Sequence, residues 1–285
     1  MYIPLCSRSL NYKELVTIRD LFHPSQPSIN YESKGFVSYK ETAPNHLIQD
    51  HIYCYWRLRT TTKLDHDFTY RVVSDGCVDI LLEVSKPEDI YITGFSSNYL
   101  QYGLGHEFDY IGVRFLPTGF PLLFNIPAFE LTNSFFSLED ILPDLSNVIS
   151  SAISPNKDLH GYKDTFDKYF GGLLKNNLVL EPDPRVMKAM MEILKSGGNK
   201  DIRDLDTGLS GRQLRRRFQF YFGDSPKTFS QVVRFQNILR AKPSLESLKQ
   251  NKIFYDLGYY DQAHFIKEFK NFYGVTPSKA FGRTD

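Results

Sequence analysis

Residues 258–277 read GYYDQAHFIKEFKNFYGVTP. Starting at Phe265, four aromatic residues recur at helical spacing (i, i+4, i+7, i+8) and would form one apolar face, while the other faces are polar or basic. Asp261 stands where a helix N-cap belongs, and Gly274 stands where a terminating glycine belongs. The pattern predicts a short helix, buried on one side, of the kind that enters a DNA groove.

A similar pattern occurs about fifty residues upstream. Residues 208–229 read GLSGRQLRRRFQFYFGDSPKTF, with Ser210 at the cap position and Leu214 and Phe218 on the apolar face. Between the two patterns, residues 229–241 have an order of apolar residues that a helix would accept. One helix-turn-helix pattern repeated within about a hundred residues predicts two similar reading heads joined by a rigid connecting helix.

The two motifs resemble the DNA-binding domain of the AraC/XylS family of bacterial transcription regulators. The resemblance covers roughly residues 184–281 and rests on LSxRQLxRxFxxxxGxSPKxF followed by LGYxDQxHFxxxFKxxxGVTP. It implies a sequence-specific regulator that binds double-stranded DNA, contacts RNA polymerase and responds to a small-molecule or protein effector, with a homodimer as one arrangement. It implies no enzyme activity and no cofactor. Two departures stand out: Asp206 replaces a small residue before the first reading helix, and Phe254 replaces an alanine before the second.

Charge supports a polyanionic partner independently of the resemblance. Residues 184–285 carry 19 Lys and Arg against 10 Asp and Glu, whereas residues 1–183 carry 15 against 23. The whole chain is therefore close to neutral, although its C-terminal part is basic and its N-terminal part is acidic. Because phosphate contacts supply most sequence-independent affinity for DNA, the basic part is the expected DNA-binding domain.

Candidate DNA contacts follow from the faces of the two reading helices. The helical pattern leaves Arg212, Gln213, Arg215 and Arg216 pointing outward near the first helix's N-terminal turns, where base edges are met. Lys227 fits a phosphate contact at the start of the connecting helix. We expect Arg217 to contact phosphate or its own domain, and His264 to pack. By resemblance, the family's base-facing positions correspond to Arg212, Arg215, Arg216, Gln262, Ala263, Ile266 and Lys267.

The front part of the chain predicts strands. Residues 39–115 contain short runs rich in β-formers, bounded by Asp-Gly, Pro or Gly, which is typical of an antiparallel barrel or sandwich. After Pro117 the pattern favours helices, best at residues 135–152 and 164–174. We therefore predict an α+β multidomain protein: a sensor or dimerisation domain at 1–174 (barrel about 39–117, helices about 118–174), a linker at 175–185, and the DNA-binding domain at 186–285.

The front part also resembles the sensor half of one AraC subgroup, which carries a YW…PDGxxDL…GVRFxPGG…ELT-like series. The resemblance spans roughly residues 39–142 and implies a small, cupin-like barrel. Ser74 stands in place of the series' first proline, and Thr118 interrupts its PGG. No ligand can be carried over from the subgroup.

The residues of the front domain suggest a site that binds a ligand or an anion. His46, His51, His66 and His106 are scattered, so no metal site is expected. Arg71 and Arg114 lie within apolar strand runs. Each could face water, pair with an aspartate such as Asp75, Asp79 or Asp109, or hold an anion inside the barrel. If the barrel holds a ligand, the expected wall residues are Tyr53, Trp56, Tyr70, Arg71 and Arg114.

Cellular context and rival functions complete the prediction. The scattered cysteines Cys6, Cys54 and Cys77, the lack of a signal peptide and the lack of a long apolar run favour a reduced cytoplasmic protein with no membrane span. One rival is a small-molecule-binding or catalytic barrel with a helical tail that binds nucleic acid non-specifically. Another is an AraC-type module controlled by a partner protein. We also expect a fragment from Pro184 onward to fold alone.

Overall fold

The front half of the chain is a β-domain. The computed structural model describes residues 16–27, 35–154, 157–176, 179–244, 246, 258–259 and 261–282, so Cys6 and Phe254 lie outside the described residues. All strand pairs are antiparallel. A six-stranded sheet has the order β1-β2-β7-β4-β5-β8, and a two-stranded sheet pairs β3 with β6. The strands are β1 Val37–Thr42, β2 Ile52–Thr60, β3 Phe68–Val72, β4 Val78–Glu83, β5 Ile90–Thr93, β6 Leu100–Gly105, β7 Asp109–Phe115 and β8 Phe135–Ser137.

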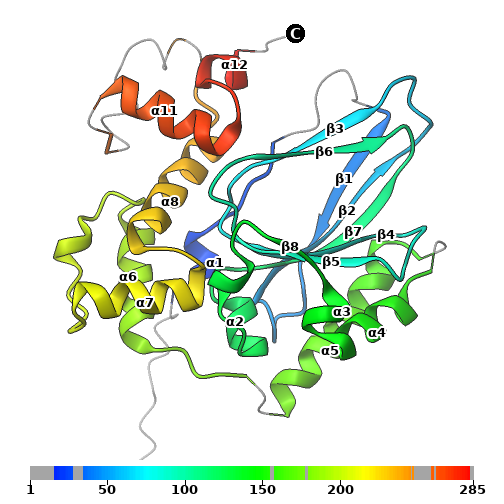
Figure 1. Ribbon diagram of the computed structural model, residues 1–285, viewed down its shortest axis with the longest axis horizontal. Coiled ribbons are helices and arrows are strands. Elements are labelled where there is room, and N and C mark those ends of the chain that lie inside the picture. Colours follow the sequence, from blue (N-terminus) through cyan, green and yellow to red (C-terminus); the bar gives the residue numbers. More distant parts are fainter. Residues whose placement is uncertain are drawn as a thin grey trace, which may run out of the picture.

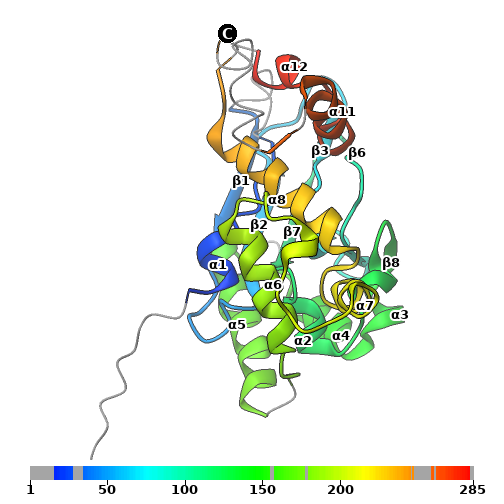
Figure 2. The same cartoon turned by 90° about the vertical axis from the view of Figure 1, so that its left-hand side faces the viewer.

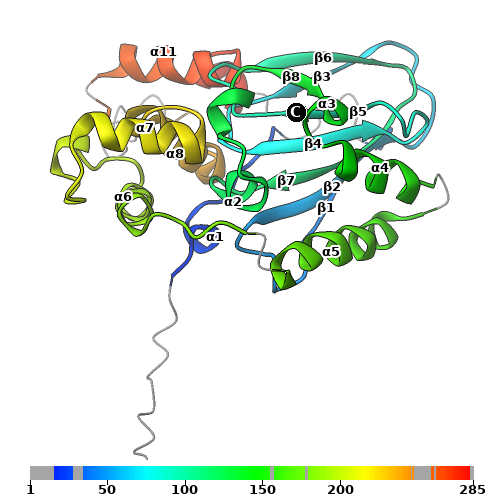
Figure 3. The same ribbon diagram turned by 60° about the horizontal axis from the view of Figure 1, so that its bottom comes forward.

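Helices cover one face of the large sheet, and the small sheet covers the other (Figures 1 and 3). Alternate residues of a strand point to opposite faces, so β4 sends Ile80 and Leu82 into a core shared with helices and sends Asp79 and Leu81 toward the small sheet. The helices of the front half are α1 Ile18–Leu21, α2 Gly119–Phe124, η2 Ala128–Leu131, α3 Leu138–Ile141, α4 Pro143–Ala152 and α5 Leu159–Lys175.

The predicted fold class is confirmed, with two refinements. The strands are arranged as two sheets in the described residues, without closing into one barrel. The helix expected over residues 135–152 was wrong at its start, because Phe135–Ser137 forms β8 and pairs with β5. Local periodicity could not reveal this, since a three-residue edge strand is defined by its partner rather than by its own pattern.

The C-terminal half is helical and contains the two predicted reading helices. They are α7 Gly211–Phe222 and α11 Gln262–Tyr273, and the connecting helix is α8. Ser210 and Gln213 form a capping box at the start of α7, and the Asp261 side chain accepts the His264 N–H at the start of α11. The expected caps are thus confirmed. The other elements here are α6 Pro184–Lys195, η3 Ile202–Asp204, α8 Pro226–Ala241 and α12 Pro277–Phe281.

The two halves share one hydrophobic core. Phe22, Val73 and Phe95 of the front half pack in the same cluster as buried residues of α6, α7, α8 and α11. The ring centroids of Phe95 and Phe222 are 4.8 Å apart. The C-terminal helices accordingly gather against one end of the sheets, with α1 beside α6 (Figures 1 and 2). No helix in the described part of the chain is long and apolar enough to span a bilayer.

Candidate DNA interface and front-domain cavity

The N-terminal turns of both reading helices are open to solvent. On α7, Arg212, Arg215 and Arg216 are exposed, while Leu214 and Phe218 are buried in the core. The planar guanidinium groups are therefore free to meet guanine edges or phosphates. The other exposed candidates are Gln213, Lys227, Gln262, Ala263 and Lys267, and Ile266 is half-buried.

Gln213 has a structural partner that the sequence-based interpretation did not consider. Its side-chain oxygen accepts the Ser210 N–H at 2.9 Å, and the Ser210 hydroxyl accepts the Gln213 N–H at 3.3 Å. Because this capping box holds the Gln213 side chain against the helix start, Gln213 has to leave it before it can read adenine. The arginines on the same turns are under no such constraint.

A buried carboxylate that sequence reasoning missed ties α11 to α8. Glu268 is 6% exposed and accepts hydrogen bonds from Tyr259 Oη and Gln231 Nε2, each at 2.7 Å. Arg234 Nη2 lies 3.6 Å from its Oε2, and His264 Nε2 lies 3.8 Å away. Burial, together with the adjacent Glu268 charge, raises the pKa of Tyr259. Since Glu268 follows Phe265 by three positions, its place on the apolar face was a usable signal.

Arg217 and His264, which we do not expect to read bases, each contact a residue of the C-terminal half. The Arg217 Nε lies 3.6 Å from Oδ2 of Asp183, the residue that caps α6. The His264 ring lies edge-on to Tyr259, with centroids 5.6 Å apart.

The C-terminal ends of both reading helices contact the front domain. At the end of α7, the Tyr221 carbonyl accepts the Thr118 N–H at 3.1 Å, and the Gly223 carbonyl accepts the Thr132 hydroxyl at 3.0 Å. At the end of α11, the Asn271 carbonyl accepts the Tyr99 N–H at 3.1 Å. The last carbonyls of a helix have no partner within it, so the front domain supplies donors that the helices need.

One residue of the front domain, Ser74, contacts both α8 and α11. The Ser74 N–H donates to the Phe272 carbonyl at 3.4 Å, and the Ser74 carbonyl accepts from Gln236 Nε2 at 2.8 Å. Gln236 Oε1 in turn accepts the Ser25 N–H at 2.7 Å. A proline at position 74 would have no N–H for Phe272, so the departure from the related series has a structural role here. Asp75, the next residue, faces the front-domain cavity.

A cavity of about 240 Å³ lies between the large sheet and the small sheet. Seven aromatic side chains and a charged cluster form part of its lining. Gly112 lets the wall close tightly, because a Cβ there would lie 2.4 Å from the Trp56 ring. The lining includes Tyr39, Trp56, Tyr70, Tyr91, Tyr102, Tyr110, Phe135, Asp75, Asp79 and Arg114.

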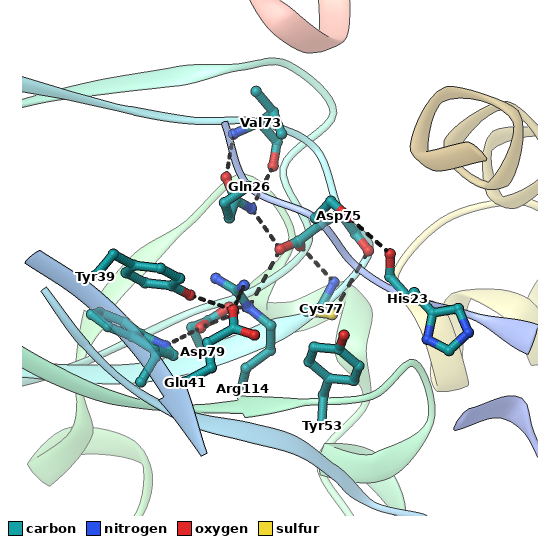
Figure 4. Close-up of polar contacts among 12 residues, drawn as sticks. His23, Gln26, Tyr39, Glu41, Tyr53, Val73, Asp75, Cys77, Asp79 and Arg114 are labelled. Atoms are coloured by element: carbon teal, nitrogen blue, oxygen red, sulfur yellow. Dashed lines mark hydrogen bonds and ion pairs between the residues drawn. The ribbon is translucent and has the colours of Figure 1, made fainter. Parts of the chain in front are cut away.

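The charged cluster centres on Arg114, which is 4% exposed (Figure 4). Its Nε lies 3.2 Å from both Asp79 carboxylate oxygens and 3.4 Å from Asp75 Oδ2. Its Nη1 is buried without a hydrogen-bond partner among the described residues; Glu41 Oε1 is 4.0 Å away. Trp56 Nε1 donates to Asp79 Oδ1 at 2.8 Å. Arg114 is thus paired with aspartates, as one sequence interpretation had it.

Burial dominates the protonation of this cluster. It raises the pKa of Asp79 to about 6; the neighbouring Asp75 charge adds to the shift, and Arg114 opposes it. Burial likewise raises the pKa of Tyr70 to about 12, so this wall phenol is neutral at physiological pH.

Three of the five predicted wall residues, Trp56, Tyr70 and Arg114, line the cavity. Tyr53 lies elsewhere, with the Arg19 guanidinium 5.4 Å from its ring centroid. The Arg71 guanidinium lies 5.5 Å from the ring centroid of Tyr273, at the end of α11. In the described residues, no group of three or more His, Cys, Asp or Glu is placed to hold a metal ion.

Comparisons with known proteins divide the chain in the same order. Residues 40–137 match a family model described as "Domain of unknown function (DUF6597)", and residues 206–283 match a model described as "Helix-turn-helix domain". An "Uncharacterized HTH-type transcriptional regulator" of Haemophilus influenzae is 34% identical over 102 residues, or 34% of this chain. The matched part spans about a third (33%) of that relative's length.

Solved structures of ToxT from Vibrio cholerae also align with this chain, with TM-scores below 0.5. The form bound to (E)-4-(8-methylnaphthalen-1-yl)but-3-enoic acid aligns with a TM-score of 0.38 and 15% identity, over 86% of this chain and 97% of that one. The form with bound unsaturated fatty acid aligns with a TM-score of 0.35 and 14% identity, over 86% and 94%. The two family matches therefore place a helix-turn-helix domain, which contains α7 and α11, behind a DUF6597 domain.

Proposed function

We propose that this protein is a sequence-specific transcription regulator of the cytoplasm that reads double-stranded DNA with α7 and α11. One observation carries the proposal. Both helices present exposed N-terminal turns, with Arg212, Arg215 and Arg216 on the first, while their opposite ends are held by the front domain. This is the orientation in which recognition helices meet base edges. The proposed role is binding rather than catalysis.

The base-reading and phosphate-binding roles divide between side chains. Arg212, Arg215 and Arg216 on α7 would supply most of the base contacts, because bidentate guanidinium pairs with guanine discriminate best. On α11, Gln262 and Lys267 are polar, whereas Ala263 and Ile266 offer only apolar contacts. Lys227, exposed in the first turn of α8, would bind a phosphate near that helix's N-terminus.

The front domain would regulate this reading through a ligand in its cavity. Asp75 lines the cavity and lies 3.4 Å from Arg114, and its neighbour Ser74 bonds both α8 and α11. A ligand that shifts Asp75 would therefore change the contacts that position two helices of the DNA-binding domain. Such a ligand controls DNA binding only to the extent that it binds the two arrangements with different affinity. RNA polymerase contact and a homodimer stay predictions from the family resemblance.

The test is selection of bound DNA by the full-length chain from a random duplex pool. The expected result is one enriched sequence, bound at least about a thousandfold more tightly than random duplex at equal salt. A matched selection from the same pool with the Arg212→Ala/Arg216→Ala double variant should enrich that sequence far less. Equal affinity for all sequences would instead favour the rival interpretation, a barrel protein with a non-specific basic tail.

A further inference from the structure

The charge in the front-domain cavity restricts which ligands it can accept. Arg114 contributes one positive charge, while Asp75 and Asp79, which also line the cavity, contribute carboxylates within 3.4 Å of its Nε. Carboxylates therefore outnumber cations at the cavity wall. A ligand anion would enter next to the negative groups that already engage the guanidinium. An organic cation would be attracted instead, because the interior screens charge poorly.

The aromatic wall favours the same charge. Tyr39, Trp56, Tyr70, Tyr102 and Phe135 surround the space. The faces of aromatic rings carry negative potential and attract an ammonium group, most strongly when it is desolvated. Because burial raises the pKa of Tyr70 to about 12, its phenol presents a neutral ring and hydroxyl.

One unpaired donor adds a second requirement. Arg114 Nη1 is buried and has no hydrogen-bond partner among the described residues. Leaving a buried donor unpaired is unfavourable, so the ligand should carry an acceptor that reaches it. An anionic acceptor would be repelled by the carboxylates around Arg114. The acceptor should therefore be a neutral oxygen.

The size of the cavity limits the rest of the ligand. A volume of about 240 Å³ holds roughly eight waters at about 30 Å³ each, or a ligand of about ten non-hydrogen atoms. We infer that the effector is a small amine with an apolar or aromatic body and a neutral oxygen close to its ammonium group. This inference rests on the proposed function.

Three compounds of similar size and different charge test this inference. 2-Amino-1-phenylethanol is the cation, 1-phenylethane-1,2-diol is the neutral analogue, and mandelate is the anion; all share the phenyl ring and its neighbouring hydroxyl. The chain contains one tryptophan, Trp56, which lines the cavity, so tryptophan fluorescence of the full-length protein reports binding there. Calorimetry gives the affinity. The amine should bind at least about tenfold more tightly than the diol, and mandelate most weakly.

Matched variants locate the binding. Asp75→Asn should weaken binding of the amine about tenfold and leave binding of the diol nearly unchanged. Glu107→Gln removes an exposed carboxylate outside the cavity lining and should change neither. As a test of the acceptor, 2-phenylethylamine, which lacks the hydroxyl, should bind more weakly than the amino alcohol. Circular dichroism and binding to the selected DNA verify that each variant is folded.

Several results would overturn the inference. They are tighter binding of mandelate or the diol, no fluorescence change with any compound, or equal loss of amine binding in Asp75→Asn and Glu107→Gln. The two proposals fail separately. A protein that selects one DNA sequence but prefers mandelate keeps its proposed function and loses this ligand class. A protein that binds the amine but selects no DNA sequence keeps this ligand class and loses the proposed function.

Discussion

At the scale of single residues, substitutions of the α7 arginines can test whether these side chains read bases or bind phosphates. Arg212→Ala or Arg216→Ala should weaken binding to the selected site by about 1–3 kcal/mol and change binding to random duplex much less. Arg217→Ala is the matched control on the same helix, because Arg217 lies beside Asp183. Titrations of both duplexes at equal salt measure the effect. A uniform loss on both duplexes would make Arg212 and Arg216 phosphate contacts.

Lys227 should behave in the opposite way. Its side chain is exposed in the first turn of α8. Lys227→Ala is expected to weaken binding to all duplexes about equally and to lower the slope of log affinity against log salt by about 1, because one counterion fewer is released. Affinities measured over a series of salt concentrations test this. An effect confined to the selected site would assign Lys227 to base reading.

Thr118 has a backbone conformation that suits glycine. Its φ is 80°, in the left-handed region, where a β-branched residue is strained. Gly at this place in the related PGG series is therefore understandable. Thr118→Gly should raise the free energy of unfolding by about 1 kcal/mol, since strain relief exceeds the loss of one small side chain. Urea unfolding measures it, with Thr132→Gly as a control that has no such strain to relieve and should destabilise.

Asp79 should make stability depend on pH. Its folded pKa of about 6 lies above the ordinary value near 4, so the folded state binds more protons between these values. The contribution of Asp79 to the free energy of unfolding therefore rises as pH falls from about 7 to about 4, by on the order of 3 kcal/mol at most. Denaturant unfolding of wild type and Asp79→Asn across this range isolates the effect. If the free energies of unfolding of the two proteins changed with pH in parallel, the prediction would be contradicted.

At the scale of elements, one buried side chain of α8 makes two hydrogen bonds to the front domain. Gln236 is 3% exposed and bonds both the Ser25 N–H and the Ser74 carbonyl. Gln236→Ala leaves both groups without that partner and should cost about 2–4 kcal/mol of unfolding free energy. Gln219→Ala, at an exposed position of α7, should stay within about 0.5 kcal/mol. If both substitutions lowered the free energy of unfolding equally, the hydrogen bonds of Gln236 would contribute no special stability.

Elements with strong local patterns could be predicted from the sequence. Caps such as Asp261 and the aromatic face that begins at Phe265 are set by neighbouring residues, so the bounds of α11 followed directly. The strand β8 could not be predicted, because its pairing with β5 is long-range. The pairing of Arg114 with both Asp75 and Asp79 likewise depends on the order of strands in the sheet, although each residue could be named as a candidate partner.

At the scale of the whole molecule, the shared core affects how the C-terminal half behaves alone. Phe222 packs on Phe95, and Phe229 lies 6.2 Å from Phe22 between ring centroids. A fragment from Pro184 onward, which we expect to fold alone, would expose these surfaces. The fragment should melt below the full-length chain by several degrees, yet still footprint the selected site, since the reading residues lie within it. Equal melting temperatures would contradict this coupling.

The bond between Ser25 and Gln236 also has a consequence for synthesis on the ribosome. These residues are 211 positions apart, so the early segment has no partner in α8 until most of the chain has been made. At roughly 5–20 residues per second, that delay is about 10–40 s. During this interval Phe22 and the strand ends beside Val73 have no C-terminal helices to cover them. The nascent front domain is therefore the stage at which chaperone binding should be strongest.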